Sequence, residues 1–334
     1  MSRRLARTAL RARLRLQLRR NPAVLLLGPR QCGKTTLARD LVDLDGPNYF
    51  DLEDPLHLSR LAEPMTQLRP LRGTVVIDEV QRRPDLFPIL RVLLDRPKAP
   101  ARFLLLGSAS QDLLRQSSES LAGRVGLVSM AGFCIGETGL SGIERAWLRG
   151  GLPRSFLAAD DAASWDWRSD YIRLLLERDV PQFGVNIPAA ALHRFWSMVA
   201  HVHGGIWTSS EPARSLGISE STVRRYLDLM CGLLMVRQLQ PWHENLTKRQ
   251  VKAPKVYVRD SGLLHQLLGI KDQASLSRHP KLGASWEGFA LEEVLRCVQP
   301  EAEYFWATHS GAELDLLMFR DGRRLGVEFK HVDA

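Results

Sequence analysis

The residues Gly28-Pro29-Arg30-Gln31-Cys32-Gly33-Lys34-Thr35 place two glycines, a lysine and a hydroxyl at the spacing of a phosphate-binding loop. Glycines let backbone N–H groups approach phosphates, and a helix that starts after the loop points its positive end toward them. Lys34 would neutralise the β- and γ-phosphates, and Thr35 would bind Mg²⁺. We therefore predict that this octet, with Thr36, binds a nucleoside triphosphate and Mg²⁺.

A second polar group ends the apolar run Thr74–Glu79 (TVVIDE), which has the form of a Walker B strand. A parallel strand would bring its last residues to the sheet edge that carries the phosphate-binding loop. There Asp78 can bind Mg²⁺ through water, and Glu79 can polarise the attacking water. The alternative is a buried strand whose acids simply begin the next loop. We predict that Glu79 and Lys34 are catalytic.

Further candidates lie beside two later strands. Ser108 and Ser110 follow the apolar run Ala101–Gly107, where a polar residue can sense the γ-phosphate. Arg124 precedes the predicted strand Val125–Met130 and can stabilise charge on the transferring phosphoryl group, in cis or from a neighbouring subunit. An arginine at the start of a strand is also a common surface ion-pair partner, so both interpretations of Arg124 stay open.

Strands and helices alternate around these residues. Because short apolar runs alternate with segments of helical spacing, we predict an α/β fold with a parallel sheet. The predicted strands are Ala23–Leu27, Asn48–Leu52, Thr74–Glu79, Ala101–Gly107 and Val125–Met130, and the predicted helices include Thr36–Val42 and Pro84–Leu94.

Composition describes an ordinary globular chain. The 334 residues are 45% hydrophobic and 25% charged, which is enough for two or three domains. No apolar run approaches ~18 residues and no apolar segment follows the N-terminus, so we expect neither a membrane span nor secretion. The four cysteines have no CxxC spacing, which favours a reducing compartment. We expect a soluble, cytoplasmic protein.

The formal net charge of +9 is concentrated at one end of the chain. Residues 1–20 hold eight arginines and no acid, and the other 314 residues are almost neutral. A rough helical stripe of leucines runs through this segment, at Leu5, Leu10, Leu14, Leu16 and Leu18. Two interpretations stay open: a basic amphipathic helix that packs beside the nucleotide domain, or a contact with phosphate backbones or a membrane surface.

From about residue 150 the sequence becomes mainly helical and contains a helix-turn-helix pattern at Ser209–Cys231. Strands at Leu233–Leu239 and Lys255–Arg259 would flank a wing loop that carries Lys248, Arg249 and Lys252. Such a winged helix could offer Arg224 and Arg225 to DNA. It could equally serve as a packing domain, because the second helix is not densely basic.

Near the C-terminus, Asp321-Gly322 is a two-residue signal for a type I′ hairpin, and such a turn fixes the register of its strands. That register pairs Asp315 with Glu328 and Glu313 with Lys330 on one face. The other face is apolar and pairs Leu314 with Phe329, Leu316 with Val327 and Met318 with Leu325. We predict a Mg²⁺ site at Asp315 and Glu328, to which Glu287 could add a ligand. The alternative is an amphipathic edge hairpin with a Glu313–Lys330 salt bridge.

Successive blocks of the chain resemble a bacterial and archaeal group of AAA-type ATPases that carry a C-terminal domain of unknown function. The blocks include GPRQCGKTTLARDL, YFDLED, VVIDEVQ, LLLGSAS, SLAGRV and GGLPRSFL, and the resemblance continues through WEGFALEEVL and VEFK, so it covers nearly the whole chain. It implies ATP binding by an AAA-like module. Lys281–Ala334 resembles a restriction-endonuclease-like core. Only four residues follow Lys330, however, whereas such a core continues with a helix and a strand, so we expect this segment to be truncated or completed by a partner.

We therefore expect four segments: a basic helix at 1–20, an AAA-like P-loop ATPase domain at 21–150, a helical and winged-helix domain at 151–260, and a small α+β nuclease-like domain at 261–334. Our first functional hypothesis is an ATPase that couples ATP hydrolysis to DNA or a DNA-associated partner. The second is a nucleotide-gated switch or scaffold for protein partners, without nuclease activity. A protein partner or a homo-oligomer fits either hypothesis.

Overall fold

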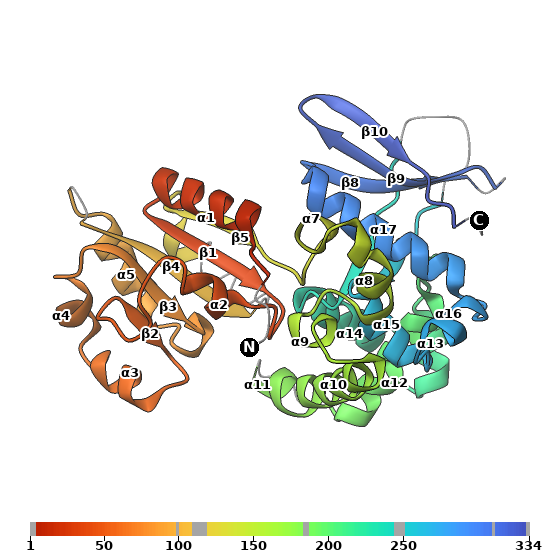
Figure 1. The fold of residues 1–334 in the computed structure, drawn as a ribbon, viewed down its shortest axis with the longest axis horizontal. Coiled ribbons are helices and arrows are strands. Elements are labelled where there is room, and N and C mark those ends of the chain that lie inside the picture. Colours follow the sequence, from red (N-terminus) through yellow and green to blue (C-terminus); the bar gives the residue numbers. More distant parts are fainter. Residues whose placement is uncertain are drawn as a thin grey trace. The chain divides into compact units, whose positions relative to one another are not determined.

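The computed structural model describes residues 5–97, 100–108, 119–182, 187–243, 251–308 and 311–331. The chain forms two compact units, Met1–Gly132 and Phe133–Ala334, which we call the N-terminal unit and the C-terminal unit (Figure 1). The finer division into four segments stays a prediction.

The N-terminal unit is built on a five-stranded parallel sheet in the order β2-β3-β4-β1-β5. All six residues of β1 are buried, as expected for a central strand of a sheet covered on both faces. Parallel strands share one carboxyl edge, so the ends of β1, β3 and β4 lie together. The strands are β1 (Ala23–Gly28), β2 (Tyr49–Asp51), β3 (Gly73–Asp78), β4 (Ala101–Ser108) and β5 (Val125–Ser129).

Several α-helices in the described part of the N-terminal unit accompany this sheet. They include α1 (Thr8–Arg20), α2 (Lys34–Ala38), α3 (Pro55–Arg60), α4 (Pro64–Leu68) and α5 (Leu86–Leu94), and Val80–Arg82 forms a 3-10 turn. Helix α1 packs against β1 and β5 (Figure 1). Leu14 and Leu18 are buried, whereas Leu16 is 43% exposed. The basic segment therefore forms a helix that packs on the sheet of the N-terminal unit. Its apolar stripe is narrower than the spacing of the leucines predicted.

The described part of the C-terminal unit is mainly helical. Its helices are α7 (Ile135–Thr138), α8 (Ile143–Arg149), α9 (Pro153–Phe156), α10 (Asp161–Leu174), α11 (Val180–Gln182), α12 (Ala189–Val202), α13 (Ser210–Leu216), α14 (Glu220–Gly232), α15 (Ser261–Leu268), α16 (Gln273–Ser277) and α17 (Leu282–Val298), with a 3-10 turn at Leu140–Gly142 and a π-helical turn at Leu175–Asp179. Gly217 is left-handed (φ 67°) and ends α13. The Ser219 hydroxyl then caps α14 by accepting a hydrogen bond from the Thr222 N–H.

Two small antiparallel sheets complete the C-terminal unit. One pairs β6 (Val236–Leu239) with β7 (Lys255–Val258), and Ile206 forms an isolated bridge to Lys255. The other has the order β10-β9-β8 and contains β8 (Ala302–Ala307), β9 (Glu313–Arg320) and β10 (Arg323–Val327). The two sheets share a hydrophobic core with α17, which includes Leu239, Tyr257, Leu291, Leu295, Phe305, Leu316 and Met318.

The C-terminal hairpin has the predicted turn and register. Asp321 and Gly322 both have positive φ (50° and 72°), as a type I′ turn requires. Leu316 pairs with Val327 and Met318 with Leu325, which confirms the predicted register for this part. Strand β10 ends at Val327, so the ladder stops before Glu328 and Lys330.

The predicted separation of polar and apolar faces is wrong at Asp315. The pairing of β8 with β9 shifts between Tyr304 and Trp306, so Asp315 and Leu316 together lie opposite Phe305. Such a bulge interrupts the alternation of side chains along a strand and re-aims one of them. The Asp315 carboxylate contacts the Lys255 ammonium, which lies 5.7 Å from the centre of the Phe305 ring in the core. Sequence spacing alone carries no signal for this bulge.

Candidate nucleotide-binding site

The phosphate-binding loop leaves the end of β1 and enters α2 directly. A Cβ added at Gly28 would lie 2.6 Å from the Met130 carbonyl oxygen and 2.7 Å from the Cys32 Sγ, so only glycine fits there. Gly33 and Gln31 adopt left-handed conformations (φ 101° and 57°). The fully buried Cys32 side chain fills the space under the loop. Strand, loop and helix therefore follow one another as the motif requires.

Lys34 is buried without a carboxylate partner. Its side chain is 5% exposed, and Nζ donates hydrogen bonds to the carbonyl oxygens of Gly28 (3.0 Å) and Pro29 (3.1 Å). Within the described residues no ion pair compensates this ammonium. Because a buried charge without a direct ion-pair partner is costly, the arrangement suits an anion that binds at Lys34. The residues present therefore fit a phosphate group.

Asp78 accepts hydrogen bonds from three elements at the carboxyl edge of the sheet. The Thr35 hydroxyl (2.6 Å) and the Tyr49 hydroxyl (3.1 Å) both donate to Asp78 Oδ2, and the Glu79 N–H donates to Oδ1 (2.9 Å). Burial raises the pKa of Asp78, whereas the hydrogen bonds from Thr35 and Tyr49 lower it. The predicted Mg²⁺ ligands Thr35 and Asp78 are thus brought together.

Tyr49 is a residue of this site that the sequence analysis missed. It begins β2, which pairs directly with β3, so its hydroxyl can reach the carboxylate at the end of β3. Burial and the nearby Asp78 carboxylate raise the pKa of the Tyr49 phenol, so its hydroxyl stays a hydrogen-bond donor. Recognising it requires the order of the strands in the sheet, which the sequence pattern does not reveal.

Glu79 follows β3 with a strained backbone. Its φ of 54° and ψ of 42° lie in the left-handed region, which a residue with a Cβ adopts at a cost. The Gln81 side-chain amide donates a hydrogen bond to the Glu79 carboxylate. At the rim of the loop Glu53 pairs with Arg30 (2.8 Å) and with Arg82 (3.3 Å). Gln81 and Glu53 are further neighbours of the site that spacing did not indicate.

Ser108 lies beside the loop. The pairing of β1 with β4 places it opposite Gly28, and its side chain is buried. Its Oγ has no hydrogen-bond partner in the described structure. A buried hydroxyl without a partner costs free energy, so this donor is available to a ligand. Ser110, the other predicted sensor, lies outside the described residues.

Arg124 does not reach the loop of its own chain. Val125 pairs with Ala23, so Arg124 lies at the amino edge of the sheet, opposite the carboxyl edge that carries the loop. A strand of this length spans roughly 16 Å. The guanidinium instead makes two hydrogen bonds to Asp95, at 2.5 and 2.9 Å. The predicted action in cis is therefore wrong, and action on a neighbouring subunit stays a prediction.

The predicted C-terminal metal site contains an internal cation. Lys255 contacts Glu313, Glu287 (3.3 Å) and Asp315 (3.5 Å), and the Tyr257 hydroxyl donates to Glu287 at 2.7 Å. Burial lowers the pKa of Lys255, but the carboxylates outweigh this effect and the net shift is upward. The sequence pattern predicted only a strand position for Lys255 and no role at this site.

The second predicted metal ligand of this site, Glu328, is exposed and pairs with Lys330 at 3.1 Å. The Phe329 N–H donates to Asp315 at 2.9 Å. Across the described ranges, no three His, Cys, Asp or Glu side chains are grouped so that they could hold a metal ion. Metal binding by Asp315 and Glu328 stays a prediction.

Models of protein families match three consecutive parts of the chain. Residues 20–139 match an AAA domain, residues 140–274 a domain of unknown function (DUF8612), and residues 282–333 another domain of unknown function (DUF4143). With the geometry of the loop, this defines a protein with an AAA-type P-loop ATPase domain, which suggests nucleotide binding, typically with Mg²⁺.

Two curated relatives are the uncharacterized proteins Rv2008c of Mycobacterium tuberculosis and Mb2031c of Mycobacterium bovis. Each is 54% identical over 324 residues, which cover 97% of this chain and 73% of the relative. The chain therefore belongs to the same family as these two mycobacterial proteins.

A solved structure, the Walker-type ATPase PABY2304 of Pyrococcus abyssi, resembles the chain with a TM-score of 0.55 at 17% identity, covering 80% of this chain and 97% of that one. This likeness concerns the fold alone. In the described parts of the chain, none of the helices has the length and apolar character needed to cross a membrane.

Proposed function

We propose that this protein binds ATP with Mg²⁺ and hydrolyses it. The observation that carries the proposal is the buried Lys34 ammonium, whose hydrogen bonds in the described structure go to backbone carbonyls alone. It lies on the loop whose next residue, Thr35, bonds to Asp78. A buried cation without a direct ion-pair partner in the described structure and a carboxylate held beside a hydroxyl suit a triphosphate with Mg²⁺.

Each residue then has a separate task. Thr35 and Asp78 would hold Mg²⁺, which neutralises phosphate charge when bound. Tyr49 holds the Asp78 carboxylate in place through its hydroxyl. Glu79 would orient the attacking water, and the hydroxyl of Ser108 would contact the γ-phosphate. Arg124 would act only on a neighbouring copy of the chain in a homo-oligomer.

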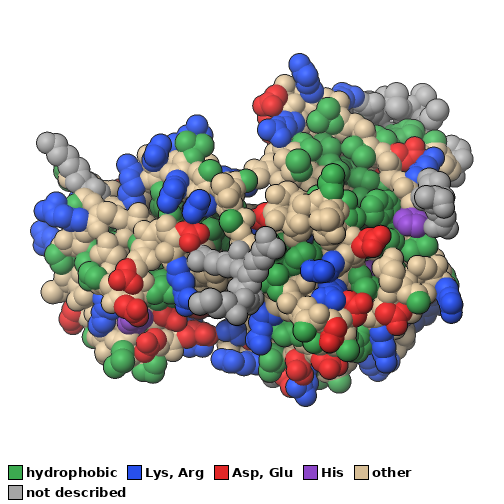
Figure 2. All heavy atoms as spheres, viewed as in Figure 1, with side chains coloured by type: hydrophobic (Ala, Val, Ile, Leu, Met, Phe, Trp, Pro, Cys, Tyr) green, Lys and Arg blue, Asp and Glu red, His purple; other side chains and the backbone are tan. Residues whose placement is uncertain are grey.

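We further propose that hydrolysis is coupled to DNA. The support is the surface of α1, where Arg15 and Arg19 are exposed at i, i+4 spacing and make no ion pair in the described structure. Basic side chains gather over α1 in Figure 2. Arginines on one helix face suit contacts with phosphate backbones.

The helix-turn-helix offers a second DNA contact, as part of a proposed winged helix made of α12–α14 with β6 and β7. Arg225 is exposed, but Arg224 pairs with Glu220 at 3.3 Å. Lys248 and Arg249 of the predicted wing lie outside the described residues. This contact has weaker support than α1, because one of its two arginines already has a carboxylate partner.

ATP turnover with and without duplex or single-stranded DNA tests the coupling, with Lys34→Ala as the background control. We expect DNA to raise turnover of the wild type and Arg15→Gln/Arg19→Gln to abolish this response, whereas Arg225→Gln leaves it nearly intact. DNA binding by the wild type should weaken steeply with salt. Turnover that is the same with and without DNA would exclude the coupling.

The second candidate function is a nucleotide-gated switch or scaffold for protein partners, in which the nuclease-like segment has no activity. The observation that favours it is Lys255, which contacts Asp315 and Glu287 of the predicted metal site and also Glu313. Calorimetry with Mn²⁺ on the full chain tests this point. Metal uptake that disappears in Asp315→Ala/Glu328→Ala would argue for a retained metal site and against the scaffold.

A further inference from the structure

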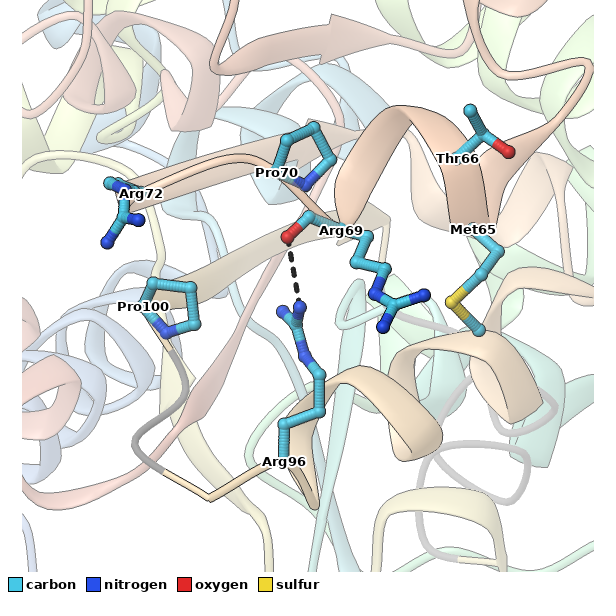
Figure 3. A pocket seen from close by; sticks show the side chains of 7 residues that line it. All are labelled: Met65, Thr66, Arg69, Pro70, Arg72, Arg96 and Pro100. Atoms are coloured by element: carbon cyan, nitrogen blue, oxygen red, sulfur yellow. Dashed lines mark hydrogen bonds between the residues drawn. The ribbon is translucent and has the colours of Figure 1, made fainter.

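A cavity of about 620 Å³ opens at the amino edge of the parallel sheet, between the end of α4 and the end of α5 (Figure 3). The Gly73 N–H at the start of β3 donates to the Pro100 carbonyl just before β4, which fixes this edge. The nucleotide loop lies at the opposite, carboxyl edge. The cavity is therefore separate from the nucleotide site.

The lining of the cavity carries charge of one sign. The charged residues of its described lining are Arg69, Arg72 and Arg96, and Met65, Pro70 and Pro100 supply apolar surface. None of the described lining residues is acidic. A cleft lined by charges of one sign raises the local concentration of counter-ions.

Arg96 forms the fixed wall. Its Nε donates to the Leu93 carbonyl (3.1 Å) and its Nη1 to the Arg69 carbonyl (2.9 Å), so it joins the C-terminal ends of α5 and α4 (Figure 3). Carbonyls at helix C-termini favour a cation, which explains this placement. Its Nη2 is buried without a hydrogen-bond partner in the described structure.

Arg69 and Arg72 have no such structural role. Both are exposed, and neither side chain makes a hydrogen bond or an ion pair within the described residues. Several other arginines of the N-terminal unit do pair with acids: Arg30 with Glu53, Arg83 with Asp85, and Arg124 with Asp95. Three guanidinium groups around one hollow repel one another unless an anion lies between them.

We propose that this cavity binds a ligand with several phosphate groups, held by Arg69 and Arg72 against the wall that Arg96 forms. A guanidinium presents paired N–H donors that match phosphate oxygens, and it is favoured over an ammonium for that reason. The phosphates belong either to a free polyphosphate-type molecule or to a nucleic-acid backbone. The proposal holds whether or not the chain hydrolyses ATP.

The test uses the full chain with Lys34→Ala, so that the nucleotide loop does not contribute. Sodium tripolyphosphate is titrated by calorimetry in EDTA, and a short fluorescent oligodeoxynucleotide by anisotropy. Arg69→Gln/Arg72→Gln is compared with Arg154→Gln/Arg278→Gln, which removes the same charge from exposed positions of the C-terminal unit. Arg69→Lys/Arg72→Lys separates charge from guanidinium geometry.

We expect the cavity variant to lose about tenfold or more in affinity, because it loses the charge-assisted hydrogen bonds of two guanidinium groups. The control should bind like the Lys34→Ala parent, and the lysine variant should recover only part of the affinity. Loss with tripolyphosphate identifies a small polyphosphate, and loss with the oligonucleotide alone identifies a nucleic-acid backbone. Absence of saturable binding of both probes, or equal affinity in the two glutamine variants, would overturn the proposal.

Discussion

The polar groups beside the phosphate-binding loop and the ion cluster around Glu292, one in each unit, have different surroundings. In the N-terminal unit, Lys34 meets only backbone carbonyls and the Ser108 hydroxyl has no partner in the described structure. In the C-terminal unit, the Glu292 carboxylate is 2% exposed and lies 2.6 Å from Arg237 and 3.2 Å from Arg259. The unmatched groups beside the phosphate-binding loop suit a ligand, whereas the matched charges around Glu292 hold elements of the fold together.

The fully buried His265 extends the contrast. One ring nitrogen lies 2.9 Å from the Leu148 carbonyl and the other 2.7 Å from the Ser285 hydroxyl, which also accepts from the Trp147 indole. This network joins α8, α15 and α17. A serine beside a histidine could suggest nucleophilic catalysis, but full burial and internal hydrogen bonding make the pair structural. The comparison predicts that replacing these buried polar residues destabilises the C-terminal unit, whereas in the N-terminal unit it disables ligand binding.

The largest effect on stability should come from Glu292→Gln. Removing the charge leaves Arg237 and Arg259 facing each other without their shared counter-ion, at a cost of about 3–5 kcal/mol. All eight tryptophans lie in residues 133–334, so tryptophan fluorescence during urea unfolding reports on the C-terminal unit alone. The exposed Glu220→Gln is the matched control and should change stability by less than about 0.5 kcal/mol. Equal effects of the two substitutions would contradict the structural role of Glu292.

Acid should destabilise the C-terminal unit through its buried histidines. Burial lowers the pKa of His203 to about 3 and that of His265 to about 4, from 6.5. Each buried histidine contributes fully to the free energy of unfolding above pH 6.5, where its side chain is neutral in both the folded and the unfolded state. The contribution is lost as pH falls, because only the unfolded state gains the proton. Per histidine the loss approaches about 2.7 kcal/mol near pH 4.5.

The control for this pH dependence is His203→Gln. Burial raises the pKa of Asp260, Glu287 and Glu293, which opposes the histidines, so the variant is needed to isolate one group. The free energy of unfolding, measured by tryptophan fluorescence, should fall less steeply from pH 6.5 to pH 4.5 in His203→Gln than in the wild type. Identical slopes would show that His203 does not contribute.

A smaller effect is expected from Tyr49→Phe in the N-terminal unit. Loss of one hydrogen bond to Asp78 should weaken Mg²⁺-dependent ATP binding by roughly three- to tenfold, which corresponds to about 0.5–1.5 kcal/mol. Because the Tyr49 hydroxyl lowers the pKa of Asp78, its removal should also move the acidic limb of the activity profile to higher pH. Tyr304→Phe is a suitable control. No change in the Mg²⁺ titration would remove Tyr49 from the site.

Much of the nucleotide site could be predicted because the motif is contiguous. Residues 28–35 must form one loop, and the apolar run before Asp78 must reach the same sheet edge. The order of the strands in the sheet, by contrast, is not determined by any single segment of the sequence. Tyr49 was missed because only the strand order places β2 beside β3. Arg124 was misplaced for another reason: it precedes a strand parallel to β1 and therefore lies at the edge opposite the loop.

The C-terminal hairpin shows the same limit. Its turn and register followed from Asp321-Gly322, because a two-residue turn fixes the strand pairing. The bulge at Asp315 and the approach of Lys255 from β7 depend on tertiary packing. Alternation in the sequence therefore predicted an acidic face without the cation that lies among its carboxylates.

The central claim is tested most directly by measuring ATP binding and ATP turnover separately in Lys34→Ala and Glu79→Gln. Lys34→Ala removes the buried counter-charge, so affinity for ATP should fall by about 100-fold or more. Glu79→Gln keeps that charge and loses only the carboxylate that orients water, so binding should stay within a few-fold while turnover falls by about 100-fold. Turnover at the wild-type rate in Glu79→Gln, or unchanged ATP affinity in Lys34→Ala, would contradict the account.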